Sequence, residues 1–116
     1  MASYKVAYMI YFKKHQRIYD DHTSVVIAMA DVVLIGKKLK SNNGAVLDLG
    51  TYAGFYKGEE ISEKQAAEIL AGYFANRDGV SFNLVGSECM KAASKCVDVS
   101  KAKKFGKVPH LQIYSV

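Results

Sequence analysis

The chain has 116 residues, 50% of them hydrophobic and 23% charged, so we expect a single globular domain over residues 1–116. No apolar run reaches the ~18 residues that a transmembrane helix needs, which argues against a membrane span. The net charge of +5 is uneven: residues 1–58 carry eight Lys or Arg against four Asp, residues 59–79 carry two against five Asp or Glu, and residues 80–116 carry six against two.

The first predicted element is a strand over Ser3–Phe12. Its sequence, SYKVAYMIYF, is rich in β-branched and aromatic residues and is apolar on both faces, which is typical of a central strand. The polar segment Lys13–Asp21 then predicts a connection. Potential metal ligands lie in or beside it, namely His15, Asp20, Asp21 and His22. Their spacing matches no established metal motif, so we expect no metal site there.

The segment Thr23–Lys40 has two interpretations. Its length of 18 residues, a capping residue at its start and lysines at its end favour a largely buried helix. Its β-branched residues and Gly36 favour instead two strands broken near Asp31, the second of which turns at Asn43-Gly44. We prefer the helix and keep the pair of strands as the alternative.

The segment Ala45–Gly58, AVLDLGTYAGFYKG, predicts an extended strand with one apolar face. Its other face would carry tyrosines separated by glycines. The glycines could mark bulges or lie under side chains of a neighbouring strand. Alternatively, the face is a flat surface whose rings stack on bases or fill a pocket of a partner. The candidate partner-binding residues are Tyr52, Gly54 and Tyr56.

The segment Ile61–Gly79 predicts a well-defined helix. Ser62, followed three positions later by Gln65, has the form of a capping box. An apolar stripe recurs at helical spacing through Ala66, Ile69, Leu70, Tyr73 and Phe74. Gly79 after Asp78 predicts the end of the helix.

The last third of the chain predicts a strand, a helix and a strand. Val80–Val85 alternates apolar and polar residues, as a half-buried strand does. Cys89–Phe105 predicts a helix with a basic end, although the sequence near Asp98 is poor helix material. His110–Val116 predicts the final strand.

Two cysteines, Cys89 and Cys96, lie seven positions apart. On one helix that spacing is about 10 Å at ~1.5 Å per residue, too far for a disulfide. We therefore expect reduced, buried thiols in a cytoplasmic protein, and no bound cofactor.

These elements predict an α+β or small α/β fold. Strands that alternate with helices favour a four-stranded sheet packed by two to three helices in a ferredoxin-like arrangement. A larger antiparallel sheet is the alternative if Thr23–Lys40 forms strands.

No phosphate-binding loop, dinucleotide-binding turn, nucleophile elbow or zinc-protease motif occurs. Whether the protein is an enzyme is therefore uncertain, and we lean against it. We expect first a non-enzymatic binding module that occupies a macromolecular partner, as an inhibitor or adaptor protein does. Unpaired strand edges also suggest a homo-oligomer such as a homodimer.

Two alternatives remain. One is a nucleic-acid-binding protein that uses the tyrosine and glycine face together with the basic C-terminal region. Its candidate residues are Lys91, Lys95, Lys101, Lys103, Lys104 and Lys107. The other is a small enzyme or metabolite-binding protein with a site between subunits.

Overall fold

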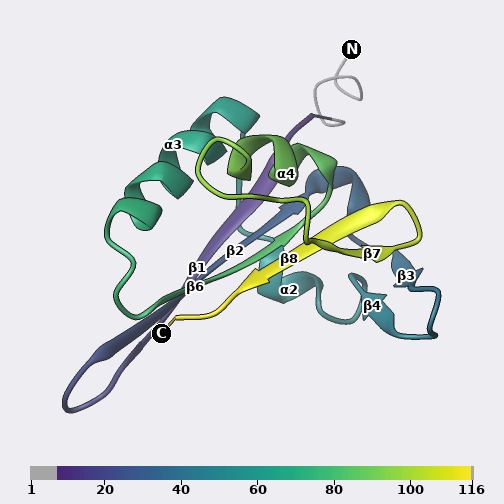
Figure 1. Cartoon of the computed structure of the whole chain (residues 1–116). Coiled ribbons are helices and arrows are strands. Elements are labelled where there is room, and N and C mark those ends of the chain that lie inside the picture. The colour runs from purple at the N-terminus through teal and green to yellow at the C-terminus, as the bar shows by residue number, and fades with distance from the viewer. Residues whose placement is uncertain (1–7, 116) are drawn as a thin grey trace.

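A six-stranded mixed sheet forms the centre of the computed structural model, which describes residues 8–115 (Figure 1). Its strands in chain order are β1 (Ile10–Ile18), β2 (Thr23–Asp31), β5 (Glu59–Ile61), β6 (Val80–Val85), β7 (Lys103–Phe105) and β8 (Val108–Ile113). A separate two-stranded sheet consists of β3 (Lys38–Lys40) and β4 (Val46–Asp48). The helices are the 3₁₀ turn η1 (Val32–Leu34), α2 (Ala53–Tyr56), α3 (Glu63–Ala75) and α4 (Ser87–Ala93).

The spatial order of the large sheet is β5-β1-β2-β6-β8-β7. The two central strands, β2 and β6, are parallel, and every other neighbouring pair is antiparallel. The parallel pair requires a long connection, which carries the β3–β4 sheet, α2, β5 and α3. The fold is therefore a mostly-sheet α+β domain.

The predicted four-stranded, ferredoxin-like arrangement is wrong. The preferred helix over Thr23–Lys40 is replaced by β2, η1 and β3, so the alternative with two strands is the one that forms. The predicted connection Lys13–Asp21 is mostly strand, because β1 continues to Ile18 and pairs along its whole length with β2. The β-branched residues of Thr23–Lys40 fit this sheet better than a helix, and Lys13–Ile18 is extended because it pairs with β2.

Two further predictions also need correction. The expected strand over Ala45–Gly58 forms only at β4, and the chain then turns into α2. The expected helix over Cys89–Phe105 starts earlier, at Ser87, and ends at Ala93, since the last residues of that segment pair as β7 with β8. Of the strand expected over Ser3–Phe12, residues 3–7 lie outside the described range, and its last three residues, Ile10–Phe12, form the start of β1.

Both faces of the sheet are covered (Figure 1). Helices α3 and α4 lie on one face, and α2 with the β3–β4 sheet lies on the other. Side chains alternate along the strands, so β2 contributes Ile27 and Met29 to the first core and Ala28 and Ala30 to the second. Among the described residues, the first core has fourteen buried members, including Phe82, and the second has six, including Leu49 and Tyr56.

The capping box of α3 is confirmed. The Ser62 hydroxyl accepts the backbone N–H of Gln65 at 3.1 Å, and the Gln65 side-chain oxygen accepts the backbone N–H of Ser62 at 2.9 Å. Ala66 and Leu70, on the inner face of the helix, are buried. The strand expected over Val80–Val85 is also confirmed. None of the helices within residues 8–115 has the length and hydrophobicity needed to cross a bilayer.

Candidate functional site

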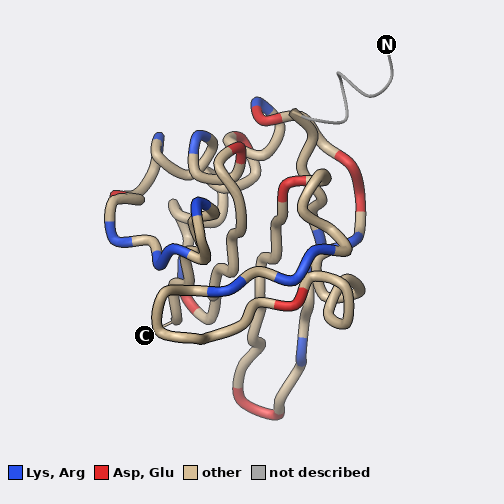
Figure 2. Tube along the Cα trace, turned by 90° about the vertical axis from the view of Figure 1, so that its right-hand side faces the viewer, with Lys and Arg blue, Asp and Glu red and all other residues tan. Residues whose placement is uncertain are grey.

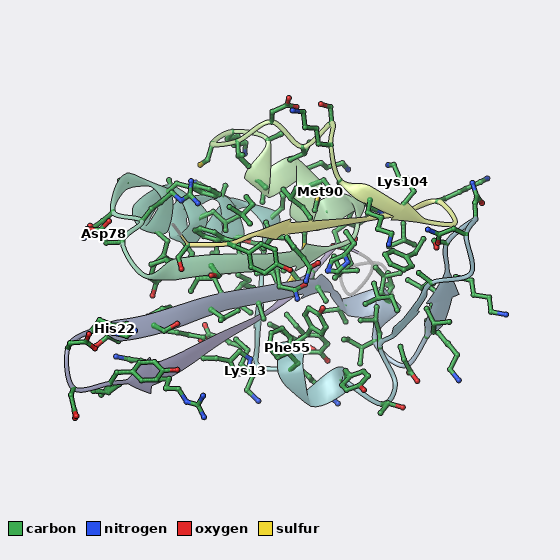
Figure 3. The ribbon with its side chains drawn as sticks, turned by 60° about the horizontal axis from the view of Figure 1, so that its bottom comes forward. Lys13, His22, Phe55, Asp78, Met90 and Lys104 are labelled. Atoms are coloured by element: carbon green, nitrogen blue, oxygen red, sulfur yellow. The ribbon has the colours of Figure 1, made fainter. Side chains whose placement is uncertain are left out.

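Three of the predicted lysines meet at one groove, which we call the lysine groove. Its volume is about 510 Å³, and it lies between α4, the loop that follows it, β7 and β8. Figure 3 labels Met90 and Lys104, which approach it from α4 and β7. The lining residues are Ser87, Met90, Lys91, Ser94, Val99, Ser100, Lys104, Lys107 and Pro109. The lining therefore combines three apolar side chains with three lysines and three serine hydroxyls.

The start of α4 is positioned by Asp31, the last residue of β2. Its two carboxylate oxygens accept the backbone N–H groups of Glu88 and Cys89, each at 3.0 Å. Burial raises the pKa of Asp31, and these two hydrogen bonds oppose the shift. These two hydrogen bonds hold the start of α4 against β2, and α4 forms one wall of the lysine groove.

Gly86 allows this close approach. Its φ of 111° lies where side chains are rarely found, and a Cβ there would lie 2.2 Å from the Asp31 Cγ. Only a residue without a side chain fits between the end of β6 and the carboxylate.

The electrostatic state of the three lysines differs. Lys91 forms an ion pair with Glu88, at 3.2 Å between Nζ and Oε2. Lys104 and Lys107 are exposed, and no acidic side chain among the described residues lies within ion-pair distance of either. Both ammonium groups are therefore available to an anion. Figure 2 faces this end of the molecule and shows Lys and Arg in blue on several adjacent segments.

The other three predicted lysines lie outside the lysine groove. Lys95 forms an ion pair with Glu63 of α3 at 3.3 Å. Lys103 lies on the opposite face of β7, with its Nζ 5.3 Å from the centre of the Phe105 ring. Lys101 is exposed in the loop before β7.

The predicted tyrosine and glycine face does not form, because Ala53–Tyr56 is helical. Tyr52 is 65% exposed, whereas Tyr56 is 3% exposed and points into the second core. Gly54 lies exposed in α2, where its carbonyl accepts a hydrogen bond from Lys13 at 2.7 Å. Of the three residues, Tyr52 alone remains an exposed aromatic surface.

A polar network joins α2 to the sheet, and the sequence did not predict it. The Tyr56 hydroxyl donates to Asn83 Oδ1 at 2.9 Å, and His110 Nε2 lies 2.8 Å from the same oxygen. Burial raises the pKa of Tyr56 to about 12. Burial, together with the charge of Lys103, lowers the pKa of His110. Asn83, a polar residue between Phe82 and Leu84 in the strand β6, is the signal that could have indicated this network.

The four potential metal ligands of the first hairpin are not brought together. His22 Nδ1 lies 2.6 Å from Asp21 Oδ1 at the exposed tip, while His15 Nε2 bonds to the Phe55 carbonyl at 2.8 Å. Within the described residues, no group of three or more His, Cys, Asp or Glu side chains could hold a metal ion.

The two cysteines are free thiols in different environments. Cys89 is fully buried in α4, and burial beside Asp31 raises its thiol pKa well above the usual range. Cys96 is half-buried and lies beyond the end of α4. A buried, protonated thiol is a poor nucleophile, so Cys89 acts as a packing residue.

No protein-family model matches the chain, and a search of curated proteins gave no match. Among solved structures, the chain is similar to an uncharacterized conserved protein from Methanopyrus kandleri, whose crystal structure superposes with a TM-score of 0.73. The two sequences are 24% identical over 93% of this chain and 92% of that chain. This similarity shows a shared fold over nearly the whole of both chains.

Proposed function

We propose that this protein binds nucleic acid and that the lysine groove holds the phosphate backbone. One observation carries the proposal: Lys91, Lys104 and Lys107 come from three different segments and converge on one groove. Phosphate contacts by lysine supply most of the affinity of proteins that bind nucleic acid without sequence preference. The serine hydroxyls of the groove add donors of the kind that position a phosphate backbone.

The apolar part of the lining suits the less polar parts of a nucleotide. Met90, Val99 and Pro109 line the groove together with the lysines, so a sugar or base edge would have apolar atoms to contact while the phosphate meets ammonium groups. The β3 strand, with Lys38 and Lys40, lies at the same end of the molecule but on the other face of the large sheet. Lys38 is paired with Asp48 at 3.9 Å, so β3 adds to the positive potential of this end without lining the groove.

The proposal is tested by replacing the two lysines that have no acidic partner. In the Lys104→Ala/Lys107→Ala variant, we expect the affinity for a labelled single-stranded oligonucleotide to fall about tenfold, as measured by fluorescence anisotropy at low salt. The slope of log affinity against log salt should become shallower by about 1.4, because each lost phosphate contact contributes about 0.7 on single strands.

A charge-matched control separates local contacts from net charge. Lys57→Ala/Lys64→Ala removes the same two charges from exposed positions on other elements, and we expect it to change the affinity less than about twofold. Equal losses in both variants, or wild-type binding that does not weaken between about 50 and about 200 mM salt, would contradict the proposal.

A further inference from the structure

Glu88 is a buried charged side chain to which the preceding sections assign no role. It lies in the first turn of α4, and its side chain is 11% exposed. Among the described residues, Asp31 is the other charged residue that is buried, and its carboxylate holds the start of α4. A carboxylate that water solvates so poorly is unfavourable unless another group compensates its charge. Glu88 therefore requires a cationic partner.

That partner is Lys91, one of the three lysines of the lysine groove. The two residues are three positions apart on α4, and Lys91 Nζ lies 3.2 Å from Glu88 Oε2. The Lys91 side chain is 60% exposed and lines the groove, whereas Glu88 is not among the lining residues. The ion pair therefore joins a lysine of the groove to a carboxylate outside it.

No second cation among the described residues could replace Lys91. The other ion pairs of this part of the chain do not include Glu88. Instead, a second carboxylate lies nearby: burial raises the pKa of Asp31, and the negative charge of Glu88 adds to that shift. Breaking a poorly solvated ion pair by removing one partner is strongly unfavourable. A phosphate therefore does not readily take Lys91 away from Glu88.

The ion pair reduces the charge that the lysine groove offers to an anion. The attraction of a phosphate backbone depends on charges that are not already neutralised by the protein. Lys104 and Lys107 have no acidic partner among the described residues, whereas the charge of Lys91 is balanced by Glu88. Three lysines line the groove, but only two of them carry an unbalanced charge.

We propose that Glu88 limits the affinity of the lysine groove for nucleic acid by neutralising Lys91. The phosphate backbone is then held by Lys104 and Lys107, and Lys91 contributes a third phosphate contact only when Glu88 has lost its charge. This inference rests on the proposed function and adds its regulation: a residue that does not touch the ligand sets how many lysines bind it.

Glu88→Gln tests the proposal, because it removes the charge and retains the shape of the side chain. The probe is the labelled single-stranded oligonucleotide, and fluorescence anisotropy gives its affinity. At low salt we expect about threefold tighter binding than in the wild type, which is roughly the share of one lysine in the tenfold loss expected for two. The slope of log affinity against log salt should become steeper by about 0.7, the contribution of one phosphate contact on a single strand.

The chain offers a matched control in Glu63→Gln. Glu63 pairs with Lys95 at 3.3 Å, and neither residue lines the lysine groove. This variant changes the net charge by the same amount and also releases a lysine from its acidic partner. We expect it to change the affinity less than about 1.5-fold and to leave the salt slope unchanged.

The double variant Glu88→Gln/Lys91→Ala gives the sharper test. It removes both members of a pair that has no net charge, so we expect the affinity and the salt slope of the wild type, although a lysine of the groove is missing. If Lys91 already contacts phosphate in the wild type, the slope should instead become shallower by about 0.7. Because this variant leaves no buried charge unpaired, it also decides the matter if Glu88→Gln does not fold.

Three outcomes would overturn the proposal. The first is equal binding by the wild type, Glu88→Gln and Glu63→Gln, and the second is the shallower slope in the double variant. Both leave the proposed function intact as long as wild-type binding weakens with salt and the Lys104→Ala/Lys107→Ala variant binds less tightly. The third is an absence of salt-dependent binding in the wild type and in Glu88→Gln, which would overturn the proposed function as well.

Discussion

Asp31 connects the central strand β2 to the wall of the lysine groove. Its carboxylate replaces the missing helical partners of the first amides of α4, and it is itself 3% exposed. The same contact requires Gly86, since its positive φ and the nearby carboxylate both exclude a side chain. The position of Met90 and Lys91 at the groove therefore depends on two residues that do not touch it.

The glycines provide a graded test of this contact. Gly86→Ala should lower the free energy of unfolding by more than about 2 kcal/mol, because it combines an unfavourable φ with a collision against Asp31. Gly106→Ala has a positive φ but open space, so it should cost about 1 kcal/mol. Gly54→Ala has neither feature and should be nearly neutral or stabilising. Urea denaturation measures all three, and equal effects would contradict the account.

The elements differ in how far their own residues specify them. α3 contains its start signal, its inner stripe and the acidic residue Glu63 in its first turn. β2 contains β-branched residues on both faces, whereas most of β1 is polar, and the neighbours of both strands in the sheet decide that they are extended. The three-residue strands β3 and β4 depend on each other and on the second core.

The cap of α3 gives a prediction at the scale of one element. Ser62→Ala should lower the free energy of unfolding by about 1 kcal/mol, since it leaves the N–H of Gln65 without its acceptor. Ser62→Asp retains an acceptor beside the positive end of the helix and should recover most of the loss. Thermal unfolding followed by circular dichroism measures both variants. An unchanged midpoint temperature in Ser62→Ala would show that the capping box does not contribute to stability.

The whole molecule consists of two unequal layers on one sheet. Among the described residues, the first core joins α3 and α4 to the sheet through fourteen buried side chains, whereas the second joins α2 and the β3–β4 sheet through six. Less apolar surface is therefore buried beneath the second layer. The charges are also divided, since the lysine groove and the acidic α3 lie on different parts of the surface.

This asymmetry predicts two levels of local stability. Amides of β2 and β6 should exchange hydrogen only on global unfolding, while those of β3 and β4, which pair through three residues each, should exchange through a smaller local opening. Hydrogen exchange followed by NMR would separate the two levels by at least about tenfold in protection. Equal protection throughout would show that the layers unfold together.

Local signals in the sequence by themselves determined α3 and β6. The capping box and stripe of α3 involve residues within a few positions of one another, and the alternation of Val80–Val85 is likewise local. They also identified the lysines of the C-terminal region as candidates. No local signal told which of the six would meet at a groove.

The tertiary structure alone decided the rest, because those outcomes depend on contacts between distant residues. An apolar run such as Thr23–Asp31 fits a buried helix or a strand covered on both faces, and only the pairing of β2 with β1 and β6 selects the strand. Likewise Lys104 and Lys107 line the same groove as Lys91 because β7 pairs with β8, and residues of β8 and α4 also line that groove. Periodicity reports which side of an element is apolar, but not what will lie against it.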